Sequence, residues 1–155
     1  WVVVGPNGTS EDFKIGERFK GKGITFTEAN IIDFALQYDP QPIHIDAHAS
    51  ESGVFGGIIA SGLQTIALTF RSFWDTGVMS ECGMGAPGID KVIWPTPLRP
   101  GDTLYGTGEV LELIPSKSRN DRGIVRMRYT GENQKGELII TLEIPQIMRK
   151  RQVAG

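Results

Sequence analysis

The segment Asp39-Pro-Gln-Pro-Ile-His44 holds the side chains of this sequence that are best suited to proton transfer. A carboxylate and an imidazole stand five residues apart, and the two prolines between them restrict the backbone. Such groups act as general acids and bases when a rigid scaffold positions them, and an imidazole titrates near neutral pH. The segment therefore predicts an acid and base pair formed by Asp39 and His44.

Asp39 also falls where a helix is expected to end. Thr25 or Thr27 can cap a helix, apolar residues then recur at three- and four-residue spacing, and Pro40 disfavours helical backbone at Asp39. A carboxylate at the negative end of a helix is less favoured in its charged form. We therefore expect Asp39 to hold a proton more readily than an ordinary aspartate. A further short helix, capped by Asp46, is expected after His44.

A second region of interest begins at Phe55-Gly-Gly57. Apolar residues on nearly every face from about Ile58 to Trp74 predict a long buried helix that these glycines open. The N–H groups and the positive dipole end at a helix start can stabilise a developing oxyanion. The small residues Ala60-Ser-Gly62 would also let a ligand or another backbone approach the first turns closely.

The second half of the chain has the two-residue alternation typical of antiparallel strands with one buried face. The expected strands are 91–97, 103–114, 124–129 and 138–148. Helices precede strands, and no internal repeat or linker is visible. We therefore expect a single α+β domain over residues 1–155, with a curved antiparallel sheet packed on the long helix.

Composition excludes several classes of protein. The 155 residues carry a net charge of −2, and the 16 lysines and arginines are scattered, which argues against nucleic acid as a partner. No apolar stretch approaches the roughly 18 residues of a membrane span. Cys82 is the one cysteine, which excludes an internal disulfide and suits a reducing compartment. We expect a cytoplasmic protein.

Two apparent motifs carry little weight. The stretch Gly83-Met-Gly85-Ala-Pro-Gly88 matches the spacing of a dinucleotide-binding loop, but that loop requires a helix after it, and here a strand pattern follows. His44, His48 and Asp46 offer metal ligands from a short turn, but no further histidine or cysteine completes the set. We expect neither a nucleotide loop nor a metal site.

Three segments together carry a resemblance to a known family. Tyr38-Asp39-Pro-Gln-Pro-Ile-His44-Ile-Asp46, Phe55-Gly-Gly-Ile-Ile-Ala-Ser-Gly62 and Arg99-Pro-Gly-Asp102 resemble the MaoC-like dehydratases, which include the (R)-specific enoyl-CoA hydratases. The resemblance extends over residues 14 to 148. It implies the hotdog fold and a homodimer or higher homo-oligomer. It also implies that an acyl-CoA or acyl-carrier thioester enters near the subunit interface, with no cofactor beyond that carrier group.

The resemblance also implies roles for individual residues. Asp39 and His44 would hold the water that adds across an α,β-unsaturated thioester, and which of them takes the water proton is left open. The backbone N–H of Gly57, as the glycine that starts the long helix, would bind the thioester oxygen, with Gly56 and Ser61 as further candidates for substrate contacts. Gln41 stands where many members have asparagine, and Gly56 where many have histidine before the helix glycine.

The function that we expect is that of a hydro-lyase, which hydrates a trans-2-enoyl-CoA reversibly to an (R)-3-hydroxyacyl-CoA. Two alternatives stay open: a hotdog thioesterase, in which Asp39 activates water at the carbonyl carbon, and a non-catalytic acyl-binding module. Basic residues near the pocket entrance would meet the CoA phosphates. The candidates by charge alone are Arg71, Lys91, Arg99, Lys117 and Arg119.

Overall fold

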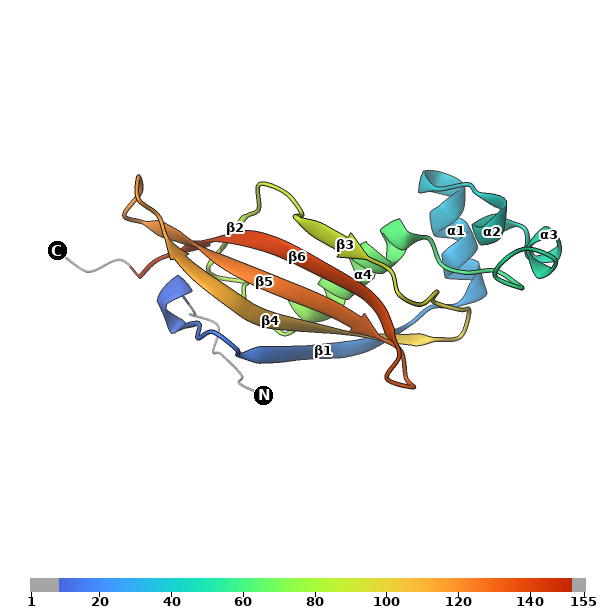
Figure 1. The fold of residues 1–155 in the computed structure, drawn as a ribbon, viewed down its shortest axis with the longest axis horizontal. Coiled ribbons are helices and arrows are strands. Elements are labelled where there is room, and N and C mark those ends of the chain that lie inside the picture. The colour runs from blue at the N-terminus through green and yellow to red at the C-terminus, as the bar shows by residue number, and fades with distance from the viewer. Residues whose placement is uncertain (1–8, 152–155) are drawn as a thin grey trace.

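The computed structural model describes residues 9–151, which form one antiparallel sheet with a long helix on one of its faces (Figure 1). The strand order is β1-β4-β5-β6-β2, and β3 also pairs with β6. The strands are β1 (Arg18–Thr25), β2 (Gly83–Gly85), β3 (Lys91–Ile93), β4 (Thr103–Pro115), β5 (Arg122–Glu132) and β6 (Leu138–Arg149). A register shift in β4 between Val110 and Glu112 is the kind of irregularity that bends a strand and increases its twist.

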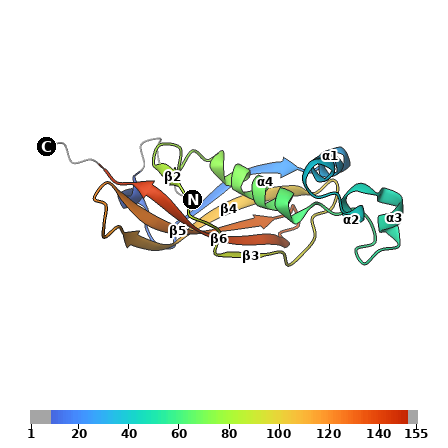
Figure 2. The same ribbon diagram turned by 90° about the horizontal axis from the view of Figure 1, so that it is seen from above.

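The helices divide into two groups. Helix α4 (Gly62–Trp74) lies along one face of the sheet, and α1 (Glu28–Tyr38), α2 (Pro42–Ile45) and α3 (Ala47–Glu51) gather at one end of the molecule (Figure 2). A 3-10 turn, η1 (Ser10–Asp12), precedes β1. This arrangement confirms the expected α+β fold.

The hydrophobic core lies between α4 and the sheet. In β5 every second side chain is buried, including Val125, Met127 and Tyr129, as expected for a strand with one covered face. Phe19 and Phe73 add an edge-to-face aromatic pair to this layer, and Phe73 packs in the same way on Tyr129. Burying a large apolar side chain contributes about 1.5 to 3 kcal/mol, so this layer anchors the helix on the sheet.

Helix α4 approaches the sheet closely because its inner face includes the small polar residues Thr69 and Ser72. A Cβ atom on Gly106 of β4 would lie 2.4 Å from the carbonyl oxygen of Thr69, so only glycine fits there. Ser72 Oγ accepts the N–H of Gly106 and donates to the carbonyl of Lys22. These bonds satisfy polar groups that would otherwise be buried without partners.

The expectation that this helix is buried on all sides is wrong. Leu63 and Trp74 are 51% and 41% exposed, whereas the polar residues Thr69 and Ser72 are buried. The reason is that the helix turns its small polar side chains toward the glycine-containing strands. Part of its apolar surface is thereby left on the outside.

The predicted start of the long helix at Ile58 is also wrong. Helix α4 begins at Gly62, and Ser61 is its N-cap, with a side chain that accepts the N–H of Leu63. The preceding residues are not helical: the N–H of Ile59 donates to the carbonyl of Ile43, and the N–H of Ala60 donates to the carbonyl of Leu98. Phe55-Gly-Gly57 therefore does not open the helix.

The other helix predictions are confirmed. Thr27 caps α1 by accepting the N–H of Asn30, and α1 ends at Tyr38 with Asp39 as its C-cap. Asp46 caps α3 by accepting the N–H of Ala49. The four predicted strands correspond to β3, β4, β5 and β6, although β3 ends at Ile93, before the predicted limit.

Candidate active site

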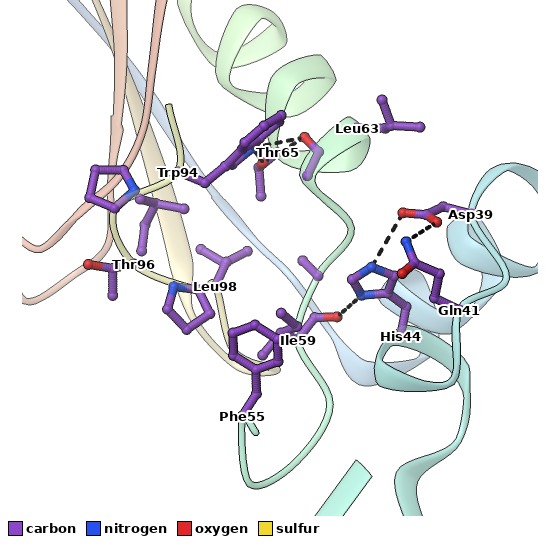
Figure 3. Close-up of a pocket in the computed structure, with 15 residues that line it drawn as sticks. Asp39, Gln41, His44, Phe55, Ile59, Leu63, Thr65, Trp94, Thr96 and Leu98 are labelled. Carbon is purple, nitrogen blue, oxygen red and sulfur yellow. Dashed lines mark hydrogen bonds and ion pairs between the residues drawn. The ribbon is translucent and has the colours of Figure 1, made fainter. Parts of the chain in front are cut away.

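A cavity of about 420 Å³ lies where α1, α2 and the start of α4 meet the segment after β3 (Figure 3). Most of its wall is apolar, and its titratable members, Asp39 and His44, lie together on one side. The residues that line it are Asp39, Gln41, His44, Phe55, Ile59, Ala60, Gly62, Leu63, Thr65, Trp94, Pro95, Thr96, Pro97, Leu98 and Ile139.

The orientation of His44 is fixed by the segment that precedes α4. His44 lies in α2, a single helical turn that begins at Pro42, and its side chain is buried. Its Nδ1 atom lies 2.7 Å from the carbonyl oxygen of Ile59. A carbonyl oxygen only accepts, so Nδ1 carries the hydrogen in this bond. The neutral ring therefore presents an unprotonated Nε2 to the pocket side.

Asp39 is held by neutral donors on both of its oxygens. Gln41 Nε2 donates to Oδ1 at 2.7 Å, and Ser61 Oγ donates to Oδ2 at 2.6 Å. These two bonds lower the pKa of Asp39 below its usual value of 3.8, and the bond from Ser61 has the larger effect. Partial burial of the carboxyl group acts in the opposite direction. The expectation that Asp39 holds a proton unusually readily is therefore wrong, because the side-chain donors outweigh the helix end.

The two side chains meet as the sequence predicted. His44 Nε2 lies 3.3 Å from Asp39 Oδ2, and the side chains of His44 and Asp39 are 5% and 18% exposed. An ionised carboxylate and the Nε2 of a neutral imidazole are both acceptors, so their approach requires a hydrogen between or beside them. Protonation of His44 supplies one, and so does a water molecule that donates to both atoms.

The start of α4 forms the adjoining wall of the cavity. The first N–H groups of an α-helix have no acceptor within the helix, and Gly62 is the first residue of α4. A Cβ atom on Gly62 would lie 2.8 Å from the indole ring of Trp94, so the close contact between them requires glycine. The Trp94 N–H donates to Thr65 Oγ1 at 3.1 Å and lies 3.3 Å from the Gly62 carbonyl, which holds the indole against this turn.

The structure brings together some of the predicted site residues and not others. Asp39, His44 and Ser61 form one hydrogen-bonded group. Gly56 and Gly57 lie in the loop before the 58–61 segment and are not among the residues that line the cavity. The premise on which Gly57 was assigned to the thioester oxygen, that it starts the helix, does not hold. The glycine at that position is Gly62, and the residue before it is Ser61.

The sequence did not reveal the role of Gly62 at the helix start. Gly62 was noted only as a small residue, and Trp94 was not linked to it. A signal for the helix start was present, because Ser61-Gly-Leu-Gln64 fits the pattern of a capping box. The Gln64 side chain instead donates to the carbonyl of Asn30, and no sequence signal predicts the contact between Trp94 and Gly62.

The candidate basic residues are distributed along the whole molecule. Lys117 and Arg119 belong to the loop between β4 and β5, at the end of the molecule opposite to α1, α2 and α3 (Figure 1). Arg71 forms an ion pair with Asp75 within one helix turn. Arg99 lies beside the Gly57 loop, since its Nη1 would be 3.8 Å from a Cβ on Gly57. Lys91 is the first residue of β3. Of the five candidates, Arg99 is the one that lies next to the loop that carries the cavity residue Phe55.

Residues 9–151 contain neither a cluster of metal ligands nor a membrane-spanning helix. In this range no three His, Cys, Asp or Glu side chains cluster so that they could hold a metal ion. Among the helices of the same range, none has both the length and the apolar character needed to cross a bilayer.

A curled antiparallel sheet around one long helix is the hotdog fold, as the resemblance implied. The family described as the MaoC like domain matches residues 11–133, and the chain belongs to this family. Family and relatives together place it among the hydratases and dehydratases.

Three relatives illustrate the similarity. The crystal structure of the MaoC-like dehydratase from Rhodospirillum rubrum has a TM-score of 0.87 and 35% identity, over 95% of this chain and all (100%) of that chain. The uncharacterised protein YdeM of Bacillus subtilis strain 168 is 31% identical over 90% of this chain and 98% of its own length. The β-methylmalyl-CoA dehydratase of Chloroflexus aurantiacus is 29% identical over 81% of this chain, which corresponds to 35% of that longer protein.

Proposed function

We propose that this protein adds water reversibly across the double bond of a trans-2-enoyl thioester to give an (R)-3-hydroxyacyl thioester. The observation that carries this proposal is the approach of Asp39 Oδ2 and His44 Nε2 to 3.3 Å at the wall of a largely apolar cavity. Hydration needs a group that takes a proton from water and returns one to the α-carbon. The relative named β-methylmalyl-CoA dehydratase supports a CoA thioester as the substrate.

His44 is the member of the pair that carries the proton in this proposal. The lowered pKa of Asp39 makes its carboxylate a poor proton holder, whereas Nε2 of neutral His44 has a lone pair that faces it. Water donates hydrogen bonds to both atoms and gives one proton to Nε2 as its oxygen forms a bond to the β-carbon. The imidazolium that results is stabilised by the adjacent carboxylate. It then returns the proton to the α-carbon, and the electron pair of the double bond forms that new C–H bond.

The start of α4 stabilises the charge that develops during this step. As the β-carbon is attacked, negative charge moves to the thioester oxygen. The N–H of Gly62 and the positive end of the α4 dipole lie on the cavity wall next to Ser61, which itself contacts Asp39. We therefore assign the oxyanion site to Gly62 in place of Gly57. The apolar residues Ile59, Leu98 and Ile139 would surround the acyl group and limit the access of bulk water.

A second copy of the chain is the partner that we propose. The outer face of α4 and the neighbouring sheet edge carry large apolar side chains that are more than one-third exposed. Contiguous exposed apolar surface is typical of subunit interfaces. The residues are Leu63, Trp74, Met84, Ile89, Ile93 and Trp94, of which Leu63 and Trp94 also line the cavity. A sedimentation experiment tests this: Ile93→Lys should shift a dimer toward the monomer, and a monomeric wild-type protein would contradict it.

The direct test of the reaction is the loss of the conjugated enoyl-thioester absorbance after purified protein is mixed with a short-chain trans-2-enoyl-CoA. The same assay with His44→Ala provides the comparison, and chiral analysis of the product tests the (R) configuration. Hydration by the wild-type protein that is absent from the variant supports the proposal.

Other outcomes would replace the proposal by one of its alternatives. Release of free thiol from a saturated acyl-CoA, without hydration, would indicate a thioesterase. Binding of acyl-CoA without turnover of any enoyl thioester in a panel of short, long, branched and acidic acyl groups would indicate a binding module.

A further inference from the structure

Ser61 makes two hydrogen bonds that have different partners and opposite directions. Its Oγ accepts the N–H of Leu63 at 3.2 Å, as the N-cap of α4, and it donates to Asp39 Oδ2 at 2.6 Å. A hydroxyl group has a single hydrogen, and the carboxylate is the partner that can only accept. The side chain is fully buried, at 0% exposure. The hydroxyl of Ser61 therefore donates to Asp39 and accepts from Leu63, and its burial leaves no solvent to replace either partner.

We propose that Ser61 is a positioning residue, whose hydroxyl holds Asp39 Oδ2 beside His44 Nε2 and ties this carboxylate to the first turn of α4. The inference rests on the proposed hydration reaction and adds to it a residue that acts through Asp39. Because the one hydroxyl hydrogen is committed to Asp39, Ser61 does not donate to the substrate while this bond is intact. Its role differs from the substrate contact that the sequence had indicated.

Both oxygens of the carboxylate are fixed by neutral donors that come from different elements. Gln41, at the start of α2, donates to Oδ1, and Ser61, before α4, donates to Oδ2. Two donors on two oxygens define the plane of the carboxylate as well as its position. Of the two, Ser61 acts on the oxygen that faces His44. Loss of its hydroxyl would therefore disturb the reacting pair more than loss of the Gln41 amide would.

The same bond also favours the ionised form of Asp39. Ser61 is the largest cause of the lowered pKa of Asp39, Gln41 is the second, and His44 contributes through its charge. In residues 9–151, His44 is the one charged or titratable side chain that lies within ion-pair distance of Asp39. The other charged or titratable residues of the neighbouring helices make no ion pair or hydrogen bond with Asp39 there: Glu28, Asp33 and Tyr38 of α1, Asp46, His48 and Glu51 at α3, and Arg71 of α4.

Two variants separate the bond to Asp39 from the cap of α4. Glycine is nearly as good as serine at an N-cap, whereas alanine is poor. Ser61→Gly therefore removes the hydroxyl with little loss of capping, and Ser61→Ala removes both. Thr27→Ala is the matched control, because Thr27 caps α1 in the same manner but does not line the cavity.

The experiment measures the pH dependence of kcat and kcat/KM for hydration, together with ¹³C NMR titration of the Asp39 carboxyl, assigned with Asp39→Asn. If Ser61 positions Asp39, both Ser61 variants raise the pKa of Asp39 in the NMR titration, because they remove the hydrogen bond that lowers it most. We expect kcat to fall by about 10-fold to 100-fold, as for loss of a hydrogen bond to a charged group. Thr27→Ala leaves the titration and kcat unchanged.

One result overturns the inference: a Ser61→Gly protein with the wild-type kcat and the wild-type titration of Asp39, whatever the stability of Ser61→Ala. The NMR titration does not depend on turnover. A wild-type protein that hydrates no enoyl thioester would therefore refute the proposed function, while the titration would still decide whether Ser61 controls Asp39.

Discussion

Carboxylates are stabilised in two different ways at the cavity and on the outer face of the sheet. Asp39 receives hydrogen bonds from the neutral donors Ser61 and Gln41, and its one ion-pair partner in residues 9–151 is the titratable His44. On the outer face, Arg128 of β5 lies between Glu109 and Glu143 of the neighbouring strands. The Arg128 side chain is 39% exposed, whereas that of His44 is 5% exposed.

The difference concerns which groups can exchange protons. A guanidinium stays charged at any pH at which the protein is folded, so the carboxylates beside it form a permanent pair. A carboxylate held by neutral donors is also ionised, but its partner here is an imidazole, a group that can both bind and release a proton. The outer pairs support the sheet, and the cavity pair retains the freedom to transfer a proton.

The largest effect is expected from removal of either member of the cavity pair. Asp39→Asn and His44→Ala should each lower kcat for hydration by about 10²- to 10⁴-fold, the usual range for loss of a general acid or base. Steady-state kinetics with a short trans-2-enoyl-CoA measure the loss, and circular dichroism verifies the fold.

His48→Ala is the matched control for His44→Ala. His48 is the second histidine of the chain, lies on the exposed side of α3 and does not line the cavity. Its replacement should leave kcat unchanged. An Asp39 or His44 variant that is as active as His48→Ala would remove that residue from the mechanism.

The pair of Asp39 and His44 also shows how much of the site could be predicted from the sequence alone. Local signals predicted it, because Thr27 and Asp39 delimit α1 and the prolines restrict the path to His44. The start of α4 was missed because Ile58 and the residues after it look helical by periodicity. Their N–H groups instead bond to Ile43 and Leu98, which are distant in sequence. The pKa of Asp39 was mispredicted for the same reason, since its strongest donor, Ser61, lies 22 positions along the chain.

Gly62→Ala tests the helix start, with a smaller expected effect. A Cβ atom there would lie 2.8 Å from the Trp94 indole, so the ring and the first turn of α4 must move apart. We expect kcat to fall by about 10- to 100-fold if the turn supplies an oxyanion donor, a part of the loss seen when such a donor is removed outright. Overpacking should lower the free energy of unfolding by about 1 to 3 kcal/mol.

The double variant Gly62→Ala/Trp94→Leu separates the two causes. The smaller leucine side chain at position 94 relieves the contact with the Cβ atom at position 62. The double variant should therefore have a higher free energy of unfolding than the sum of the two single effects predicts. Additive effects on the free energy of unfolding, measured by urea denaturation, would show that the indole is not what excludes a side chain from position 62.

The pH dependence of stability provides a weaker but independent comparison. The pKa of Asp39 in the folded protein is lowered, chiefly by Ser61, from an ordinary value of 3.8. The contribution of its carboxylate is therefore complete above that value and is lost as the pH falls through the lowered folded pKa. Wild-type protein and Asp39→Asn should differ most in the free energy of unfolding near neutral pH and least in acid. Urea titrations between about pH 2 and pH 6 test this, and a difference that is constant with pH would contradict it.

The smallest effect is expected on the outer face. Arg128→Gln removes the ion pairs to Glu109 and Glu143. Both glutamates lie directly opposite Arg128, Glu109 on β4 and Glu143 on β6. Exposed pairs contribute about 0.2 to 1 kcal/mol each, and salt screens them. The free energy of unfolding should therefore fall slightly in dilute buffer and by less in about 1 M salt, with kcat unchanged. A loss of kcat as large as that of the Ser61 variants would mean that the sheet face and the cavity are coupled, and that a permanent ion pair also tunes the reacting carboxylate.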